Sequence, residues 1–287
     1  MKWIFALNAE SVESYGDFAR VAVLSARKHS SLDAVCLFDG DEGRFTSWLR
    51  EQGVQVVRAR STFYDDIARE AKARNDPFWL RVGAGAFLRL EIPRVARELG
   101  WDDEFVFYTD CDVMFQSDPR PLLEPLRPKL FAAAPETFRD KPLHMNTGAM
   151  WMNVRALDDP GFVAWTHANI GKCLNFAFDQ GAFRAFYNPL HRLAWKWNVS
   201  NSLFYGVMSR LPFKTWKWEP LPLELNWKAY WGPNPDARVF HFHGLKPTQR
   251  AELAAGTLPP FISVMHSPFW EECAAQWDEL LKEAGDC

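Results

Sequence analysis

The sequence predicts an α/β fold with a mostly parallel central sheet. Three short apolar runs, each ending in polar residues, alternate with stretches that have helical spacing. A fourth run, Phe105–Thr109, has the length of a buried strand and ends at an acidic pair. Strands that alternate with helices at this interval are typical of βαβ units, whose strands are parallel. The chain of 287 residues, 48% of them apolar, is long enough for one large domain, and this composition excludes intrinsic disorder.

The first half of the chain follows the alternation of strands and helices closely. Its predicted strands are 3–7, 34–38, 54–57 and 105–109. Between them, apolar residues recur with helical spacing at 18–26, in the amphipathic stretch 45–49 and from 84 to 99. Pro93 limits how regular the last of these helices is, because proline lacks the N–H that a helix interior needs.

The second half is predicted to be less regular. Residues 211–235 are rich in proline and tryptophan, and we expect them to wrap the core as a long excursion. A strand is predicted at 238–240. The stretch 269–284 carries one apolar helical stripe with acidic residues opposite, so core packing is its expected role. It lacks the basic face of a membrane-binding helix.

Charge and composition exclude several classes of protein. With 33 basic and 36 acidic side chains, the net charge of −3 offers no basic excess for a nucleic-acid backbone. The N-terminal apolar run is too short for a signal peptide or a membrane span, which predicts a cytoplasmic protein without a transmembrane segment. Five cysteines form no C-x-x-C pair, and reduced, mostly buried thiols are expected.

Asp110 and Asp112 are the most specific local feature. They directly follow the predicted strand 105–109, and ligands of open α/β sheets bind outside the carboxyl ends of the strands. Two carboxylates there suit Mg²⁺ or Mn²⁺ with a phosphate-bound ligand. The alternative is a solvated turn whose acids cap a helix. The position favours the metal site, because an acid beside a buried strand is costly unless a cation or hydrogen bonds compensate it.

A second candidate is the segment 241–247, with the sequence His-Phe-His-Gly-Leu-Lys-Pro. An imidazole combined with carboxylates suits Mn²⁺, and Gly244 and Lys246 could bring backbone amides and a cation to phosphates. Treating the segment as a continuing strand, we place the side chains of His241 and His243 on opposite faces. We therefore expect only one of the two histidines to join a given site.

Amides and a carboxylate make the third candidate. Asn146 and Gly148 lie in the apolar stretch 144–154, and Asp179 and Gln180 open a predicted helix. Converging amide and carboxylate groups can hydrogen-bond sugar hydroxyls. Taken singly, Asn146 suits a turn and Asp179 suits a helix N-cap, so only their combination indicates a sugar site.

Six segments follow one another along the chain: Phe87–Leu90, Val106–Val113, Met145–Ala149, Asp179–Gln180, Trp197–Asn198 and His241–Pro247. In this order they resemble the motifs of glycosyltransferase family 8, which comprises retaining, metal-dependent sugar-nucleotide transferases of the GT-A fold. Glycogenin-like enzymes and bacterial lipopolysaccharide galactosyl- and glucosyltransferases belong to it. The resemblance extends from the loop at Asn8 to Pro247.

The resemblance implies one GT-A-like catalytic domain over 1–287, with a nucleotide-sugar-binding half at 1–115 and an acceptor-side half at 116–287. It implies Mn²⁺ or Mg²⁺ as cofactor, a UDP-hexose as donor, and a glycan or lipopolysaccharide precursor as hydroxyl acceptor. The implied metal ligands are Asp110, Asp112 and His241, and the implied catalytic residues are Gln180, near the anomeric carbon, and Asp179. The implied donor contacts are Asn8, Ala9, Glu10, Tyr15, Arg89, Asp110, Cys111, Asn146, Gly148, Gly244 and Lys246.

The sequence departs from the family pattern in its last motif and in its asparagine motif. Only Leu245 separates Gly244 from Lys246, where the family usually has two residues, and no tryptophan follows Pro247. This makes His243 an alternative metal ligand. Thr147 also stands where the family usually has alanine.

Two rival functions remain at this point. One is a phosphatase similar to the haloacid dehalogenases with Asp110 as nucleophile, although the sequence lacks the later Gly-Asp-x-x-x-Asp motif that such enzymes need. The other is a sugar-nucleotide-binding protein without catalytic activity.

Overall fold

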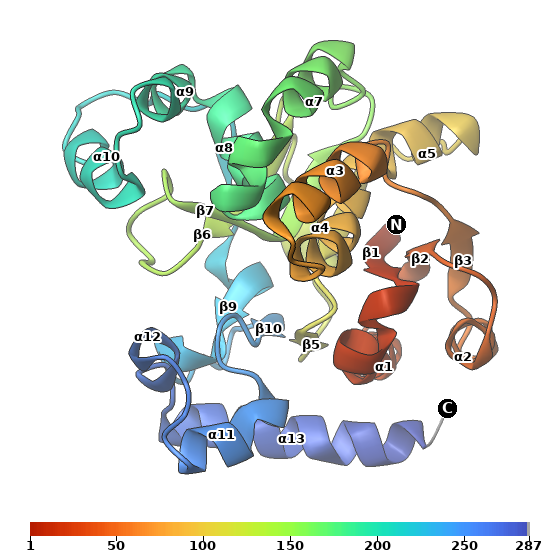
Figure 1. The fold of residues 1–287 in the computed structure, drawn as a ribbon. Coiled ribbons are helices and arrows are strands. Elements are labelled where there is room, and N and C mark those ends of the chain that lie inside the picture. Colours follow the sequence, from red (N-terminus) through yellow and green to blue (C-terminus); the bar gives the residue numbers. More distant parts are fainter. Residues whose placement is uncertain (286–287) are drawn as a thin grey trace.

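A computed structural model describes residues 1–285 and has the predicted α/β architecture (Figure 1). Seven strands form the main sheet in the order β3-β2-β1-β4-β7-β6-β8. The first four are mutually parallel, and β7 runs antiparallel to both β4 and β6. The strands are β1 (Lys2–Asn8), β2 (Asp33–Asp39), β3 (Gln55–Arg58), β4 (Phe105–Thr109), β6 (Phe131–Pro135), β7 (Met145–Asn153) and β8 (Glu219–Pro220).

A second, three-stranded sheet stands beside the first. It has the order β5-β10-β9, formed by β5 (Val113–Phe115), β10 (Val239–His241) and β9 (Trp227–Lys228). The Pro- and Trp-rich excursion 211–235 contributes β8 to the main sheet and β9 to the small one. The small sheet therefore places β10 between the end of the excursion and the segment that follows β4.

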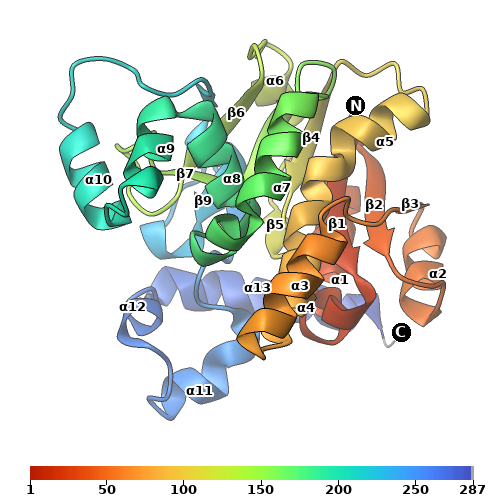
Figure 2. The ribbon, with the colours of Figure 1, turned by 45° about the horizontal axis from the view of Figure 1, so that its top comes forward.

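Helices cover both faces of the main sheet (Figure 2). Strand β1 shows the two layers by its alternation: Trp3, Phe5 and Leu7 pack with α1, α2 and α13, whereas Ile4 and Ala6 pack with α3, α5, α7 and α8. The helices are α1 (Val12–His29), α2 (Arg44–Glu51), α3 (Tyr64–Arg74), α4 (Phe78–Phe87), α5 (Ile92–Glu98), α6 (Arg120–Leu123), α7 (Pro160–Asn175), α8 (Phe178–Tyr187), α9 (Pro189–Lys196), α10 (Asn201–Met208), α11 (Arg250–Ala254), α12 (Pro260–Ser263) and α13 (Pro268–Ala284).

The helix predicted over 84–99 is instead three segments. Helix α4 begins six residues earlier than expected, at Phe78, a 3₁₀ turn occupies Leu88–Glu91, and α5 starts at Ile92. Pro93 lies in the first turn of α5, where its missing N–H leaves no helical hydrogen bond unmade. The 3₁₀ turn carries Arg89, which is buried.

Two other expectations, the packing of the C-terminal stripe and the burial of the cysteines, are confirmed for the described residues. The C-terminal helix α13 buries its apolar stripe, with Trp270 and Cys273 in the core. Within residues 1–285, no helix is both long and apolar enough to cross a membrane. Cys36, Cys111, Cys173 and Cys273 are free and buried, and Cys287 lies outside the described residues.

Candidate active site

Two carboxylates and one imidazole meet just beyond the carboxyl end of β4. Asp110 follows β4, Asp112 precedes β5, and His241 is the last residue of β10. The antiparallel pairing of β10 with β5 sets His241 opposite Val113, next to Asp112. One ligand atom of each of the three side chains lies within 4.8 Å of the others. The structure therefore brings together the three residues that the sequence suggested as metal ligands.

A chain of hydrogen bonds with a single direction orients the imidazole of His241. Its Nδ1 lies 2.8 Å from Oδ1 of Asn226, whose Nδ2 donates to Asn146 at 3.0 Å. The amide of Asn146 then donates to Gln180 at 3.1 Å, and that of Gln180 to Glu136 at 2.8 Å. Since an ionised carboxylate only accepts, this direction makes Nδ1 of His241 the donor.

The donor set fits a divalent cation. With its proton on Nδ1, His241 turns the lone pair of Nε2 toward Asp112, and that nitrogen lies 3.3 Å from Oδ1 of the carboxylate. Two acceptors that face each other at this distance repel unless a cation or a proton stands between them. Carboxylate oxygens with one imidazole nitrogen suit Mn²⁺, and the hydrogen bond from His241 to Asn226 is of the kind that fixes metal-bound histidines.

Gly148 makes room for this cluster. It lies in β7, and its carbonyl accepts a hydrogen bond from the backbone N–H of Asp110 at 2.9 Å. A Cβ atom at this position would lie 2.2 Å from Cε1 of His241 and 2.9 Å from Oδ2 of Asp110. Only glycine therefore lets both side chains approach β7.

In this structure Lys246 neutralises Asp112. Its Nζ donates to Oδ2 of Asp112 and, at 2.6 Å, to the carbonyl oxygen of Phe242. Burial opposes ionisation of Asp112, but the charge and the hydrogen bond of Lys246 outweigh it and hold the pKa of the carboxyl well below its usual range. The ammonium group therefore occupies one of the oxygens that a metal ion would use.

Arg89 links Asp110 to Asp179. Its Nη2 donates to Asp110 at 2.8 Å, its Nε lies 2.9 Å from Asp179, and its Nη1 donates to the carbonyl oxygen of Thr147 at 2.6 Å. Burial, offset in part by Arg89 and reinforced by the charge of Asp110, raises the pKa of Asp179 to about 6. The hydroxyl of Thr147 donates to Asp179 at 3.1 Å.

Three residues of this site were missed from the sequence. Glu136 follows β6 directly. It accepts a hydrogen bond from Gln180, and its carboxylate also pairs with Arg184 and His144. Because β6 runs parallel to β4, the strand-end rule that identified Asp110 could have found it. Asn226 and Lys228 come from the excursion, and no local motif marks them. Lys228 is fully buried beside Asn226, and burial lowers its pKa to about 7.

A cavity of about 270 Å³ opens in front of the cluster. Among its lining residues are Asn8, Tyr15, Arg89, Asp110, Cys111, Asp112, His241, His243 and Lys246. The side-chain Oδ1 of Asn8 is buried here without a hydrogen-bond partner. Five expected donor contacts, Ala9, Glu10, Asn146, Gly148 and Gly244, do not line this cavity, and neither do Asp179 and Gln180, which are buried behind it.

The expectation that His241 and His243 point to opposite faces is wrong. Residues two apart in a strand share a face, and β10 in any case ends at His241. Both rings reach the cavity, with their centroids 5.6 Å apart. They differ in partner, because Nε2 of His243 lies 3.6 Å from Glu136. The geometry favours His241 over His243 as the ligand beside Asp112.

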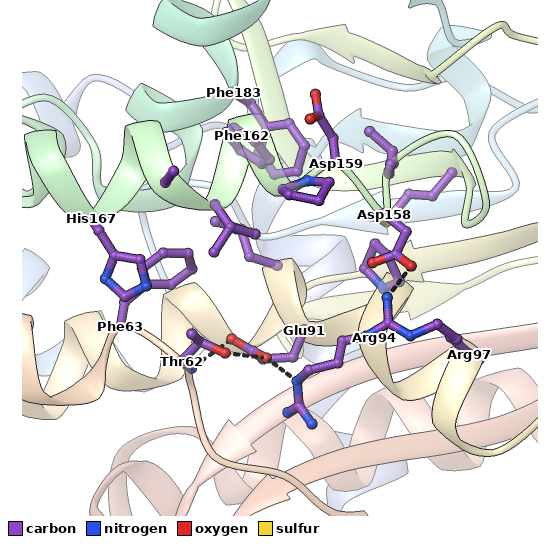
Figure 3. Close-up of a pocket in the computed structure, with 17 residues that line it drawn as sticks. Thr62, Phe63, Glu91, Arg94, Arg97, Asp158, Asp159, Phe162, His167 and Phe183 are labelled. Carbon is purple, nitrogen blue, oxygen red and sulfur yellow. Dashed lines mark hydrogen bonds and ion pairs between the residues drawn. The ribbon is translucent and has the colours of Figure 1, made fainter.

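A larger cavity, of about 410 Å³, lies apart from these residues (Figure 3). Apolar side chains such as Phe63 and Phe162 make up most of its wall. Its buried carboxylate, Glu91, accepts hydrogen bonds from Thr62 and Arg94 at 2.7 to 2.9 Å. Since these polar groups satisfy one another, the smaller cavity is the candidate active site.

The comparisons with known proteins identify the fold. No protein-family model and no curated protein sequence matches the chain. Among solved structures, the galactosyltransferase LgtC in complex with donor and acceptor sugar analogs has a TM-score of 0.58 at 15% identity, over 100% of this chain and 97% of that one. The chain has a GT-A fold.

Two further structures agree with this assignment. An active-site mutant of LgtC has a TM-score of 0.53 at 16% identity, over 93% of this chain and all of that one. The glycosyltransferase GlyE of Streptococcus pneumoniae TIGR4 has a TM-score of 0.50 at 16% identity, over 98% of this chain. The chain spans 63% of GlyE, just under two thirds of its length.

Proposed function

We propose that the protein is a metal-dependent, retaining glycosyltransferase of family 8. It transfers a hexose from a nucleoside-diphosphate sugar, a UDP-hexose, to a hydroxyl group of a glycan or lipopolysaccharide precursor. One observation carries the proposal: Asp110, Asp112 and His241 converge within 4.8 Å at the carboxyl edge of the sheet of a GT-A fold. That edge is where ligands of open α/β sheets bind.

The three converging side chains would hold Mn²⁺ or Mg²⁺ against the diphosphate of the donor. The bound ion supplies positive charge where negative charge builds on the leaving phosphate oxygens. Lys246 pairs with Asp112. If a metal ion neutralised Asp112, the ammonium group of Lys246 could contact a phosphate oxygen, which is the role that the family resemblance implies for it.

On the nucleoside side, Asn8, Tyr15 and Cys111 line the same cavity. The unpartnered Oδ1 of Asn8 is a buried acceptor, and it would accept an N–H of the base. Ala9 and Glu10 follow Asn8 in an exposed turn, so their side chains would border the nucleoside rather than enclose it. Gly244 lies outside the cavity and serves the backbone turn, at a φ of +82°.

Gln180 and Asp179 would act on the sugar. The amide of Gln180 is fixed by Asn146, Thr147 and Glu136, so its position does not depend on the substrate. Oxygen atoms near the anomeric carbon favour the oxocarbenium-like transition state of the departing sugar. The acceptor hydroxyl would attack on the face from which the diphosphate leaves and pass its proton to the departing phosphate, which retains the configuration.

The proposal gives the two halves of the chain different roles in substrate binding. Residues 1–115 supply the nucleoside side and both aspartates, and residues 116–287 supply the acceptor side. Three residues of the second half also line the donor cavity: His241, His243 and Lys246. A cytoplasmic location stays a prediction.

Binding of the donor tests the proposal. We expect a UDP-hexose at 100 times its dissociation constant to stabilise the wild type by about 2.7 kcal/mol with Mn²⁺, a shift of roughly 5 to 10 °C in melting temperature. Asp112→Asn should abolish this shift, and Asp41→Asn, at an exposed site, should leave it unchanged. A shift that is independent of Mn²⁺, or that persists in Asp112→Asn, would refute the metal site.

The rival functions give different outcomes. Hydrolysis of p-nitrophenyl phosphate that requires Asp110, without stabilisation by any sugar nucleotide, would identify a phosphatase. Metal-dependent binding of a UDP-hexose without turnover toward any acceptor or water would identify a binding protein.

A further inference from the structure

Residues 189–218, which we call the α9–α10 surface, carry an unusual charge. They contain five basic side chains and no Asp or Glu, in a chain whose net charge is −3. All five of these cations are exposed. They are Arg192, Lys196, Arg210, Lys214 and Lys217. Only Lys214 has an ion-pair partner among the described residues, Glu219, at 3.2 Å.

The same surface exposes large apolar side chains. Five of the eleven large hydrophobic residues that are exposed among the described residues lie in these thirty positions. They are Leu193, Trp197, Leu203, Val207 and Phe213, and Trp197 is 70% exposed. Single exposed apolar residues are ordinary, but a group of them beside cations indicates an interaction site.

Helical spacing places the two kinds of side chain next to one another. Arg192 and Lys196 are four residues apart in α9. Leu193 and Trp197, the C-cap residue of the helix, repeat that spacing one position further on, so the two pairs form neighbouring rows. The opposite side of α9 is buried, and it carries His191, Ala194 and Trp195. The exposed residues therefore belong to one face of this helix.

Helix α10 continues the apolar part of the surface. Leu203 and Val207 are four residues apart on its exposed side, and Phe204 is buried. In both views α9 and α10 lie at the edge of the molecule, away from α2 and α5 (Figures 1 and 2).

We propose that the α9–α10 surface binds an anionic phospholipid bilayer. Cations attract anionic headgroups, and tryptophan, leucine and phenylalanine side chains enter the boundary between headgroups and acyl chains. A second copy of the chain fits less well, because it would set five cations against five. A nucleic acid would leave Leu203 and Val207 without a role.

Contacts within the fold connect this surface to the candidate active site. The ring of Tyr205, in α10, lies 4.4 Å from that of His144, which pairs with Glu136 at 2.7 Å. Glu136 in turn holds Gln180. If the protein transfers sugar as proposed, a bilayer on the α9–α10 surface would bring a lipid-linked acceptor close to Gln180. The lipid binding itself does not depend on that activity.

Co-sedimentation with vesicles tests the inference. The wild type should sediment with phosphatidylcholine vesicles that contain about one third phosphatidylglycerol, and not with pure phosphatidylcholine, and salt should weaken the binding. Lys196→Glu with Lys217→Glu should weaken it at least about tenfold, because each basic residue near an anionic membrane contributes about 1 kcal/mol. Lys72→Glu with Lys129→Glu changes the net charge equally at exposed sites elsewhere and should have a small effect.

The apolar contribution has its own pair of variants. Trp197→Ser with Leu203→Ser should weaken binding at least about fivefold, whereas Phe261→Ser with Val264→Ser, at 67% and 79% exposed positions, should not. Circular dichroism and melting temperature check that each variant is folded.

Several outcomes would overturn the inference. These are equal binding to neutral vesicles, equal losses in the control variants, or concentration-dependent self-association without vesicle binding. Retention on a polyanion such as heparin without binding to vesicles would indicate a different partner. The salt and lipid dependence of the wild type decides the matter even if a variant fails to fold.

Discussion

Replacing Lys246 by methionine separates its structural role from its role toward the donor. The side chains of Lys246 and Asp112 are 18% and 8% exposed, and the pair is completed by the carbonyl oxygen of Phe242. Methionine keeps most of the volume of lysine and removes its charge. The carboxylate of Asp112 then stays buried without its cationic partner, with Nε2 of the His241 imidazole 3.3 Å away.

The size of the effect follows from this burial. Removing one partner of a buried ion pair costs about 3 to 5 kcal/mol, and we expect Lys246→Met to cost at least about 3 kcal/mol. The loss applies to the metal-free protein. A cation that binds Asp112 no longer has to displace an ammonium group, so the variant should bind Mn²⁺ about tenfold more tightly than the wild type, a difference of about 1.4 kcal/mol.

Two assays measure the two parts of this prediction. Urea denaturation with and without Mn²⁺ gives the free energy of unfolding, and calorimetric titration with Mn²⁺ alone gives the metal affinity. Titration with UDP in the presence of Mn²⁺ should show the opposite order, with weaker binding in the variant because a phosphate contact is lost. Lys72→Met, at an exposed position, should change the stability by less than about 0.5 kcal/mol.

Neutralisation of Asp112 by Lys246 would be refuted if the variant were as stable as the wild type without metal. It would also be refuted if Mn²⁺ bound the wild type and the variant with the same affinity. Either result would mean that Lys246 does not neutralise Asp112 in solution.

Three further predictions concern the side chains around the proposed metal ligands. Gly148→Ala places a Cβ 2.2 Å from Cε1 of His241. This substitution should weaken Mn²⁺ binding at least about tenfold and lower the free energy of unfolding by about 1 to 3 kcal/mol. In the control Gly206→Ala, whose Cβ would have nothing within 4 Å, Mn²⁺ should bind as in the wild type. Asn226→Ala removes the acceptor that orients His241, and titration should show about 10- to 100-fold weaker Mn²⁺ binding, whereas unchanged affinity would exclude this orienting role. Burial raises the pKa of Asp179 to about 6, above its value in the unfolded chain, so its ionisation destabilises the fold as the pH rises from 4 to 6. The free energy of unfolding of Asp179→Asn, measured by denaturation, should therefore increase by about 3 kcal/mol relative to the wild type between pH 4 and pH 7. A difference that stays constant over this range would contradict the raised pKa.

Much of this site could be predicted because it lies where a regular element ends. Asp110 and Asp112 follow the strand β4, and the periodicity of the apolar runs located that strand correctly. Arg89 was identified although the helix around it was not, because its motif does not depend on the helix boundaries. Local sequence patterns therefore located the acidic pair and the sheet edge together.

The residues that contact the proposed metal ligands could not be found in the same way. Asn226 ends a 3₁₀ turn inside the excursion, and its place beside His241 depends on the pairing of β9 with β10. Gly148 has no side chain, and the need for glycine at this position becomes visible only when His241 and Asp110 are placed around it. Residues two apart in a strand share a face, so periodicity alone does not separate His241 from His243. Their different partners, Asp112 and Glu136, come from the tertiary structure.

The anomeric configuration of the product tests the central claim most directly. The wild type would be incubated with Mn²⁺, α-linked UDP-hexoses and a panel of saccharide acceptors, and the anomeric proton of each product would be followed by NMR. We predict an α-linked product that forms only with metal and is absent with Asp112→Asn. A β-linked product, or transfer that persists in Asp112→Asn, would contradict retaining transfer through Asp110, Asp112 and His241.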